Sequence, residues 1–264
     1  MPPPDLPRLP RPRARPLGVE VDAVTLDQAA AWVIAAARTD GPFRYVVTPN
    51  LDHSLRLADD PHFRAAYAGA SLSIADGWPV VAASRVFGPA LPERVTGSDL
   101  VPRVFELADP AQPLRVFLLG AAPGVGLRAA SRLRERYPGV RVVGVEAPEP
   151  GFEHDPAENA RLIRGIRAAG TELLVVGLGA PKQELWSAAH AGSLGRGVGV
   201  CVGATIDFLA GERRRAPPLL RGLGVEWLHR LASEPRRLGP RYARNALGLP
   251  RLIAREWQLR ISGG

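Results

Sequence analysis

The chain is poor in the residues that most often build metal centres and covalent active sites. Its 264 residues include one cysteine, Cys201, and one lysine, Lys182. A single cysteine excludes an internal disulfide and any metal cluster held by cysteines. Cys201 lies in an apolar run, which favours a buried core thiol over a nucleophile. The five histidines do not pair at the spacing of metal ligands and no Asp-x-Asp motif occurs, so the sequence predicts no metal site.

Long apolar runs are also missing. No stretch approaches the roughly 18–20 apolar residues of a membrane-spanning helix, and no signal peptide is recognisable. Residues 1–16 are rich in proline and arginine, a composition typical of a disordered tail. We therefore expect a cytoplasmic protein whose contact with a membrane is peripheral and on its inner face.

Positive charge is concentrated at the other end of the chain. Residues 212–264 hold twelve arginines and four acids, a surplus that equals the formal net charge of +8 for the whole chain. Tryptophan, tyrosine and leucine recur between these arginines, which predicts short amphipathic helices. Such a surface suits anionic lipid or phosphate. We expect a basic helical appendage over residues 212–264, after a catalytic α/β domain over residues 17–211.

Strand-like and helix-like segments alternate through this body. The predicted strands are Arg44–Thr48, Ser71–Ala75, Arg115–Gly120, Arg141–Val145, Glu172–Gly177 and Gly197–Val202. The predicted helices are Leu26–Arg38, Asp60–Ala68, Trp78–Phe87, Ser98–Leu107, Gly124–Arg136, Pro156–Ala169 and Pro181–Ala191. Four strands are nearly continuous runs of Val, Leu and Ile, as in strands covered on both faces. The order predicts a Rossmann-like, mainly parallel sheet with helices on both faces.

Unusual polar residues follow these strands directly. They are Thr48, Asn50, Asp76, the loop Gly120–Gly126, Lys182, Gln183 and Asp207. Ligands of parallel sheets bind at the carboxyl ends of the strands. The clustering therefore predicts an active site along this one edge.

Several of these residues admit two interpretations. Asp76 suits a general base or a helix N-cap. Thr48 and Asn50 suit hydrogen bonds to a sugar or the cap of the following helix. Arg94, in a loop further on, suits a bidentate clamp on a diphosphate or an ion pair with Glu93.

Three further candidates also admit two interpretations: Lys182, Gln183 and Asp207. Lys182 and Gln183 open a helix after a strand, an ordinary start signal, but Lys182 is the chain's one lysine and could have a task that arginine performs poorly. Asp207 suits a contact to a ribose or base edge, or the cap of a turn.

The loop Gly120–Gly126 resembles a dinucleotide fingerprint. Its glycines let backbone N–H groups approach a phosphate, and Glu146 follows at the distance of a ribose-binding acid. The spacing is GxxxGxG rather than GxGxxG. An NAD-dependent oxidoreductase is therefore one alternative, and a tight turn of a Rossmann-like fold is another.

Taken together, the motifs resemble the WecG/TagA/CpsF family of bacterial glycosyltransferases. The matching stretches are Thr48–Asn50, Ile74–Gly77, Glu93–Gly97, Val116–Gly120, Gly177–Glu184, Val202–Phe208, Arg215–Pro217, Gly224–Leu231, Glu234–Leu238 and Arg241-Tyr242. The resemblance covers about residues 17–260.

The resemblance implies a GT-E-like fold and an inverting transferase that needs no metal or cofactor. Such enzymes move an N-acetylmannosamine-type sugar from UDP onto polyprenyl-diphosphate-linked N-acetylglucosamine, at the inner face of the bacterial membrane. They serve the synthesis of teichoic acid, enterobacterial common antigen or exopolysaccharide. Asp76 is then similar to the catalytic base. The residues similar to substrate contacts are Thr48, Asn50, Arg94, Gln183, Gly120, Asp207, Arg230, Arg237 and Arg241.

A third alternative is a binding module driven by the basic appendage. Its charge lies among tryptophan and leucine at helical spacing, which suits a membrane or anionic-lipid surface better than nucleic acid. The same exposed apolar residues are suited to packing on a second copy of the chain in solution.

Overall fold

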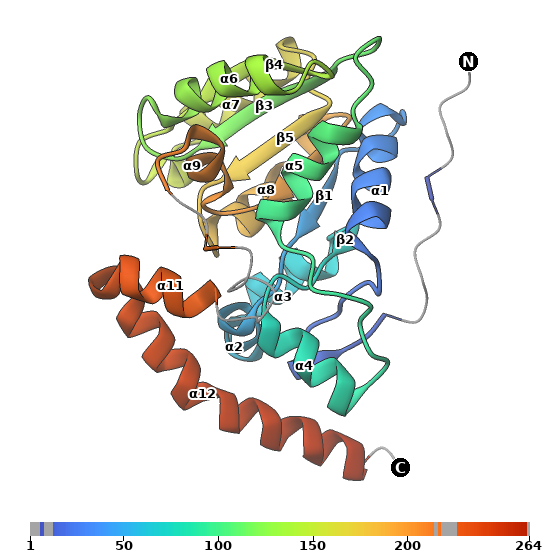
Figure 1. Cartoon of the computed structure of the whole chain (residues 1–264), viewed down its shortest axis with the longest axis vertical. Coiled ribbons are helices and arrows are strands. Elements are labelled where there is room, and N and C mark those ends of the chain that lie inside the picture. The colour runs from blue at the N-terminus through green and yellow to red at the C-terminus, as the bar shows by residue number, and fades with distance from the viewer. Residues whose placement is uncertain (1–5, 8–12, 214–215, 218–225, 263–264) are drawn as a thin grey trace.

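The computed structural model describes residues 6–7, 13–213, 216–217 and 226–262. Six parallel strands form a sheet in the order β2-β1-β6-β5-β3-β4. They are β1 (Arg44–Val47), β2 (Leu72–Ser73), β3 (Leu114–Gly120), β4 (Val140–Glu146), β5 (Leu173–Gly177) and β6 (Val198–Cys201). The Rossmann-like fold class and all six predicted strands are confirmed (Figure 1).

Helices cover both faces of the sheet, as the apolar strands predict. Along β3, Val116 and Leu118 enter one core, and Phe117 and Leu119 enter the other. The first core lies under α1 (Leu26–Arg38), α5 (Gly97–Leu107), α6 (Val125–Arg136) and α9 (Thr205–Ala210). The second lies under α3 (Pro61–Ala68), α7 (Pro156–Ala168) and α8 (Lys182–Leu194).

Polar caps fix where several of these helices begin. Thr25 and Gln28 form a reciprocal capping box at α1, with N–H···O distances of 3.2 and 2.9 Å. The carboxylates of Asp60 and Asp155 accept two backbone N–H groups each at the starts of α3 and α7. These caps satisfy backbone N–H groups that the first turn of each helix leaves without a partner.

Two helices and one boundary differ from the predictions. The short helices α2 (Leu51–Asp59) and α9 follow their strands after only a few residues and are not among the predicted helices. The predicted disordered tail is wrong for residues 13–16. The backbone of Ala14 pairs with that of Val21, and Arg13 Nε donates to the buried carboxylate of Asp22 at 2.8 Å. A buried carboxylate needs such a partner, so the ordered chain begins before residue 17.

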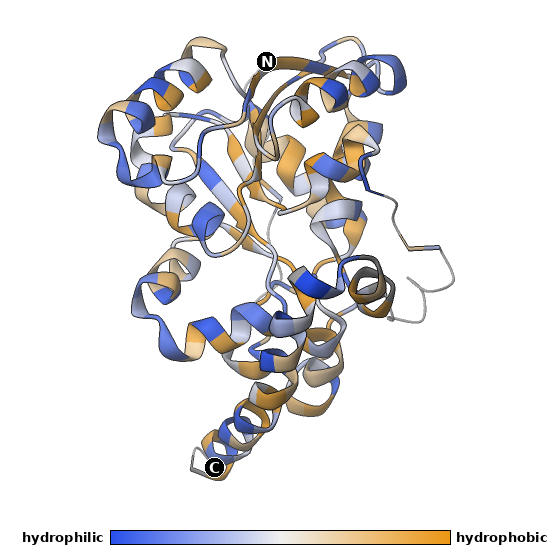
Figure 2. Ribbon diagram, turned by 90° about the vertical axis from the view of Figure 1, so that its left-hand side faces the viewer, coloured by the Kyte–Doolittle hydropathy of each residue, from blue (hydrophilic) through white to orange (hydrophobic). Residues whose placement is uncertain are grey.

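The basic appendage is helical, as predicted. It comprises α11 (Glu226–Ser233) and α12 (Pro235–Ser262), and α12 runs below α2 and α4 (Trp78–Phe87) (Figure 1). Leu252 joins Leu17 and Phe87 in a small third core, and the ring of Trp257 lies 5.5 Å from that of Phe87. Hydrophobic and hydrophilic residues alternate along α12 (Figure 2), so one side packs on the body and other apolar side chains stay exposed.

Candidate functional site

The loop between β1 and α2 is held by side-chain hydrogen bonds. Thr48 is buried, and its hydroxyl donates to the carbonyl of Cys201 at 2.9 Å, which ties β1 to β6. Asn50 caps α2, because its Oδ1 accepts from the N–H groups of Asp52 and His53 at 3.0 and 3.3 Å. The capping interpretation of Asn50 is therefore observed, and Thr48 braces the sheet edge.

Asp76 lies at the carboxyl end of β2, against this loop. Its backbone N–H donates to the carbonyl of Pro49 at 2.9 Å. The N-cap of α4 is Gly77 rather than Asp76, so the Asp76 carboxylate is not the cap. A Cβ on Gly77 would lie 3.0 Å from Cα of Asn50, which shows how closely the two loops approach. The half-buried Asp76 is thus followed directly by a residue that must be small.

The segment that carries Arg94 joins the same edge. The N–H of Val95 donates to the carbonyl of Ala75 at 3.0 Å, so Arg94 is brought to the residues just before Asp76. Oε1 of the neighbouring Glu93 accepts the N–H of Leu26 at 2.5 Å. The backbone bonds therefore bring the segments of Asn50, Asp76 and Arg94 together from three separate parts of the chain.

Gln183 links two further loops of the edge. Its Oε1 accepts the N–H of Gly203 at 3.0 Å, and its Nε2 donates to Oε1 of Glu184 at 2.8 Å. Both side chains are buried, and Oε2 of Glu184 has no hydrogen-bond partner in the described part of the chain. Burial raises the pKa of Glu184 to about 7, because the carboxylate loses its hydration.

A buried pair of polar rings lies behind Asp76. Nδ1 of His53 is 2.6 Å from the hydroxyl of Tyr67. Burial lowers the pKa of His53 to about 3, so the imidazole is neutral, and its tautomer sets which of the two groups donates the hydrogen bond. Burial raises the pKa of Tyr67, and three neighbouring acidic groups raise it further: Glu184, Cys201 and Asp76. These interactions put the base candidate and the buried groups in one electrostatic neighbourhood.

Sequence reasoning missed the buried polar groups. His53 was one of five histidines without a paired spacing, Tyr67 lay in no motif, and Glu184 stood only at the end of the stretch Gly177–Glu184. The available signal was their position: each lies on the inward face of an amphipathic helix, where polar residues are uncommon. That pattern marks a buried network without saying which groups it joins.

The appendage reaches this edge through α12. Nη2 of Arg241 lies 3.5 Å from Oδ1 of Asn50. Arg230 lies in α11 and Arg237 in α12, and their side chains lie outside the described residues. The prediction that appendage arginines meet the sheet edge therefore has direct geometry for Arg241.

Close packing explains why the loop after β3 has glycine at two of its positions. Gly120 has φ +109°, and a Cβ there would lie 2.5 Å from the carbonyl oxygen of Gly177. A Cβ on Gly126 would lie 2.5 Å from Cγ1 of Val145. Close contact of β3 with β5 and of α6 with β4 thus requires glycine at both positions.

Two charged candidates have partners away from Asp76. Arg161 donates two hydrogen bonds to the carboxylate of Glu146, at 2.9 and 3.0 Å. The NAD interpretation requires this carboxylate to bind a ribose, but both of its oxygens already accept from Arg161. Nζ of Lys182 lies 2.8 Å from Oε1 of Glu153 and 5.6 Å above the ring of Phe152. The lone lysine thus helps to close a turn on the outer side of α8.

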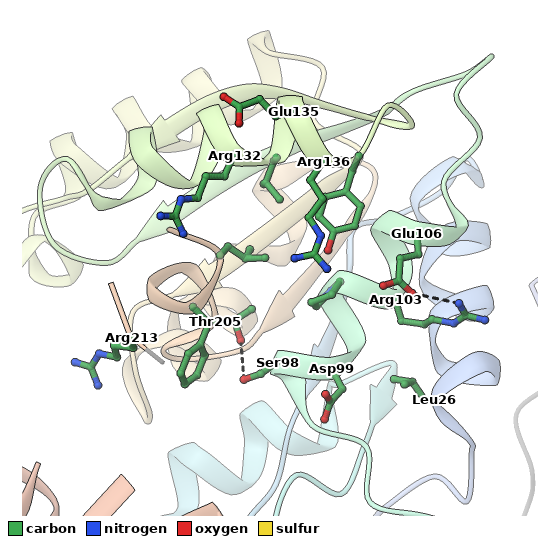
Figure 3. A pocket seen from close by; sticks show the side chains of 15 residues that line it. Leu26, Ser98, Asp99, Arg103, Glu106, Arg132, Glu135, Arg136, Thr205 and Arg213 are labelled. Carbon is green, nitrogen blue, oxygen red and sulfur yellow. Dashed lines mark hydrogen bonds and ion pairs between the residues drawn. The ribbon is translucent and has the colours of Figure 1, made fainter. Parts of the chain in front are cut away.

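A pocket of about 790 Å³ lies between α5, α6 and α9, away from Asp76 (Figure 3). Arginines from α6 and acids from α5 surround it, and the hydroxyls of Ser98 and Thr205 lie 3.4 Å apart at its wall. Asp207 is also on α9, with its Oδ2 3.9 Å from Nε of Arg213, which lines the pocket. The mixed charge of the walls does not select one ligand class.

Among the described residues, no three His, Cys, Asp or Glu side chains are grouped to hold a metal ion. Within the described ranges, too, none of the helices combines the length and apolar character needed to cross a bilayer.

The fold and the edge together define a class. An all-parallel sheet covered by helices defines an α/β protein, and the acid, amide and guanidinium groups at its carboxyl edge are typical of a site for a polar ligand. The family model described as the glycosyl transferase WecG/TagA/CpsF family matches residues 14–262. The chain belongs to this family. It is a glycosyltransferase that takes a sugar-nucleotide donor and a sugar acceptor, and this replaces the oxidoreductase alternative.

Proposed function

We propose that the protein transfers an N-acetylmannosamine-type sugar from UDP to polyprenyl-diphosphate-linked N-acetylglucosamine, with inversion and without a metal ion. The reaction serves cell-surface polysaccharide synthesis, such as that of teichoic acid or exopolysaccharide. The observation that carries the proposal is the position of Asp76, fixed at the carboxyl edge by the backbone bonds of Asp76 to Pro49 and of Val95 to Ala75. A carboxylate that stands on a fixed backbone segment at a ligand edge suits a general base.

The proposed step is a single displacement. Asp76 takes the proton of the acceptor hydroxyl as its oxygen attacks the anomeric carbon. The bond between that carbon and the UDP oxygen breaks on the opposite face, which inverts the configuration. UDP leaves with the bonding electron pair, and its diphosphate gains negative charge.

Arginine is the proposed counter-charge for that diphosphate. Arg94 adjoins the Asp76 segment, and Arg241 reaches Asn50 from the appendage. Arg230 and Arg237 are proposed to complete the set. Guanidinium groups match phosphate in bidentate geometry and act more strongly where water is excluded.

The other candidates support the substrate site from the neighbouring loops. Thr48 and Gln183 hold the loops after β1, β5 and β6 together, and their remaining hydrogen-bonding capacity is proposed to contact the sugar. Gly120 and Asp207 are proposed to contact UDP at the far end of the edge. Lys182 is proposed to support the site without contacting the substrate, since its ammonium group pairs with Glu153.

The appendage is proposed to dock on the inner face of the membrane. Trp257, Leu247 and Ile261 of α12 are exposed, and arginines alternate with them. An amphipathic helix of this kind lies in the interface between lipid headgroups and acyl chains. That position would present a polyprenyl acceptor to the edge.

The test is UDP release from a panel of UDP-sugars, with a polyprenyl-diphosphate-N-acetylglucosamine analogue and EDTA present. Wild type is expected to release UDP only with acceptor, and Asp76→Asn is expected to lower kcat by about 10²-fold or more. Asp109→Asn is the matched control, because Asp109 lies in an exposed turn after α5 and its substitute can still accept the N–H of Ala111. An Asp76→Asn enzyme as fast as wild type would exclude Asp76 as the base.

A further inference from the structure

The first turn of α2 carries a buried carboxylate that is surrounded by guanidinium groups. Oδ1 of Asp52 accepts from Nη2 of Arg244 at 2.6 Å. Its Oδ2 accepts from Nε of Arg56 at 3.1 Å and lies 3.8 Å from Nε of Arg241. The side chain of Asp52 is only 4% exposed, so these contacts replace its water.

The charges of this cluster do not cancel. Burial alone would raise the pKa of Asp52, but hydrogen bonds from Arg244 and Arg56 and the charge of Arg241 lower it, so the carboxylate is ionised. One negative charge therefore faces three positive charges. Nε of Arg241 is also buried without a hydrogen-bond partner in the described part of the chain. The surplus leaves the guanidinium groups able to bind a further anion.

The cluster connects the appendage to the catalytic edge. Arg56 and Asp52 belong to α2, whereas Arg241 and Arg244 belong to α12. Arg241 spans from Asp52 to Asn50, and the Asn50 loop packs against the segment of Asp76. Asp52 is thus the buried point at which α12 is fixed relative to the base candidate.

We propose that Asp52 is a positioning residue that fixes α12 on α2 and holds Arg241 at the sheet edge for the diphosphate of a substrate. Its effect on turnover rests on the proposed function, whereas its effect on the docking of α12 does not. Removing one member of a buried ion pair leaves the other charge without compensation, so the loss is large compared with that at an exposed pair.

The chain provides a matched comparison between the same two helices. Asp59 of α2 pairs with Arg251 of α12 at 3.0 Å, but these side chains are 61% and 69% exposed. Asp59→Asn therefore removes an ion pair of the same type and the same helix partners, without burial. Asp59 has no part in the proposed catalytic site.

Docking is measured by backbone hydrogen exchange in the full chain. Asp52→Asn is expected to speed exchange in α12 by about tenfold or more, with α6 unchanged, whereas Asp59→Asn changes it by less than about threefold. Arg244→Gln removes the shortest contact, from a side chain that is 57% exposed, and it is expected to act like Asp52→Asn. Unchanged α12 exchange in both Asp52→Asn and Arg244→Gln would overturn the proposal.

Turnover is then measured for Asp52→Asn, Arg241→Gln and the double variant, by UDP release. If Asp52 acts through Arg241, kcat falls in each single variant and the double variant is no slower than the slower single one. Losses that multiply would show that Asp52 acts independently and would overturn its positioning role. If wild type releases no UDP from any donor, the proposed function fails, while the exchange result still decides whether Asp52 fixes α12.

Discussion

Replacing Glu184 with glutamine should change how the stability of this protein depends on pH. Glu184 is fully buried and accepts one side-chain hydrogen bond, from Gln183. Glutamine has the same shape and keeps an oxygen that can accept that bond, but it does not ionise. The substitution therefore isolates the cost of ionising this one carboxyl group in the folded protein.

The magnitude follows from the pKa values in the two states. The pKa of Glu184 rises from 4.5 to about 7 on folding, so the folded protein holds the proton more tightly than the unfolded chain. The stabilising contribution is complete below pH 4.5 and is lost as pH rises through 7. Linkage then gives a loss of about 2.5 kcal/mol in the free energy of unfolding between pH 5 and pH 8.

The assay is urea unfolding of wild type and Glu184→Gln at several values between pH 5 and pH 8. His53 acts in the opposite direction, because its lowered pKa makes the folded protein lose stability as pH falls. This contribution is common to both proteins, so the difference between them at each pH isolates Glu184. We expect the free energy of unfolding of Glu184→Gln, relative to that of wild type, to rise by about 2.5 kcal/mol between pH 5 and pH 8.

The control for this prediction is the same substitution at an exposed glutamate. Glu135→Gln makes the same chemical change on an exposed face of α6 and is the matched control. Any unsatisfied amide N–H in Glu184→Gln lowers stability by the same amount at every pH and does not alter the slope. A difference between Glu184→Gln and wild type that varies by less than about 0.5 kcal/mol would refute the raised pKa.

Two further predictions concern stability and are checked by urea unfolding. Gly120→Ala should cost about 3 kcal/mol or more, because alanine is strained at φ +109° and its Cβ meets the carbonyl of Gly177. Asn159→Ala should cost about 2–4 kcal/mol, because it leaves the indole N–H of Trp186, now 2.7 Å from Asn159 Oδ1, buried without a partner.

Each of these has a control in α7. Gly165→Ala places a methyl group in open space on a helix, and should stabilise by about 0.5–1 kcal/mol. Arg164→Ala, on the exposed face beside Asn159, should change stability by less than about 0.5 kcal/mol. If Gly120→Ala matched Gly165→Ala, or Asn159→Ala matched Arg164→Ala, the packing or hydrogen-bond argument would be wrong.

Much of the architecture was predictable from local patterns. Six strands were recognisable because apolar runs such as that in β3 are short and bounded by turns, and the helices α1 and α4 were predicted to the residue. The helix α2 was missed because its nine residues follow Asn50 at once, and a cap so close to a strand end reads as a loop.

The candidate site was predictable in part. Asp76 and Asn50 were candidates because parallel strands bring the residues after them to one edge, and Arg94 was a candidate because a guanidinium group suits a clamp on a diphosphate. The sequence explained Gly120 by the approach of a phosphate, but close packing against Gly177 already requires a glycine there. Whether that loop also contacts UDP stays a prediction.

The sequence by itself determined the parallel sheet, the edge on which the polar residues gather and the family, because periodicity and ordered motifs are local properties of the chain. Only the tertiary structure decided that Asp52 meets Arg241 and Arg244, which lie about 190 residues further along, and that Glu184 is buried. Charge pairing and desolvation depend on which surfaces meet in space. No spacing in the sequence encodes that a carboxylate on α2 lies under a helix at the other end of the chain.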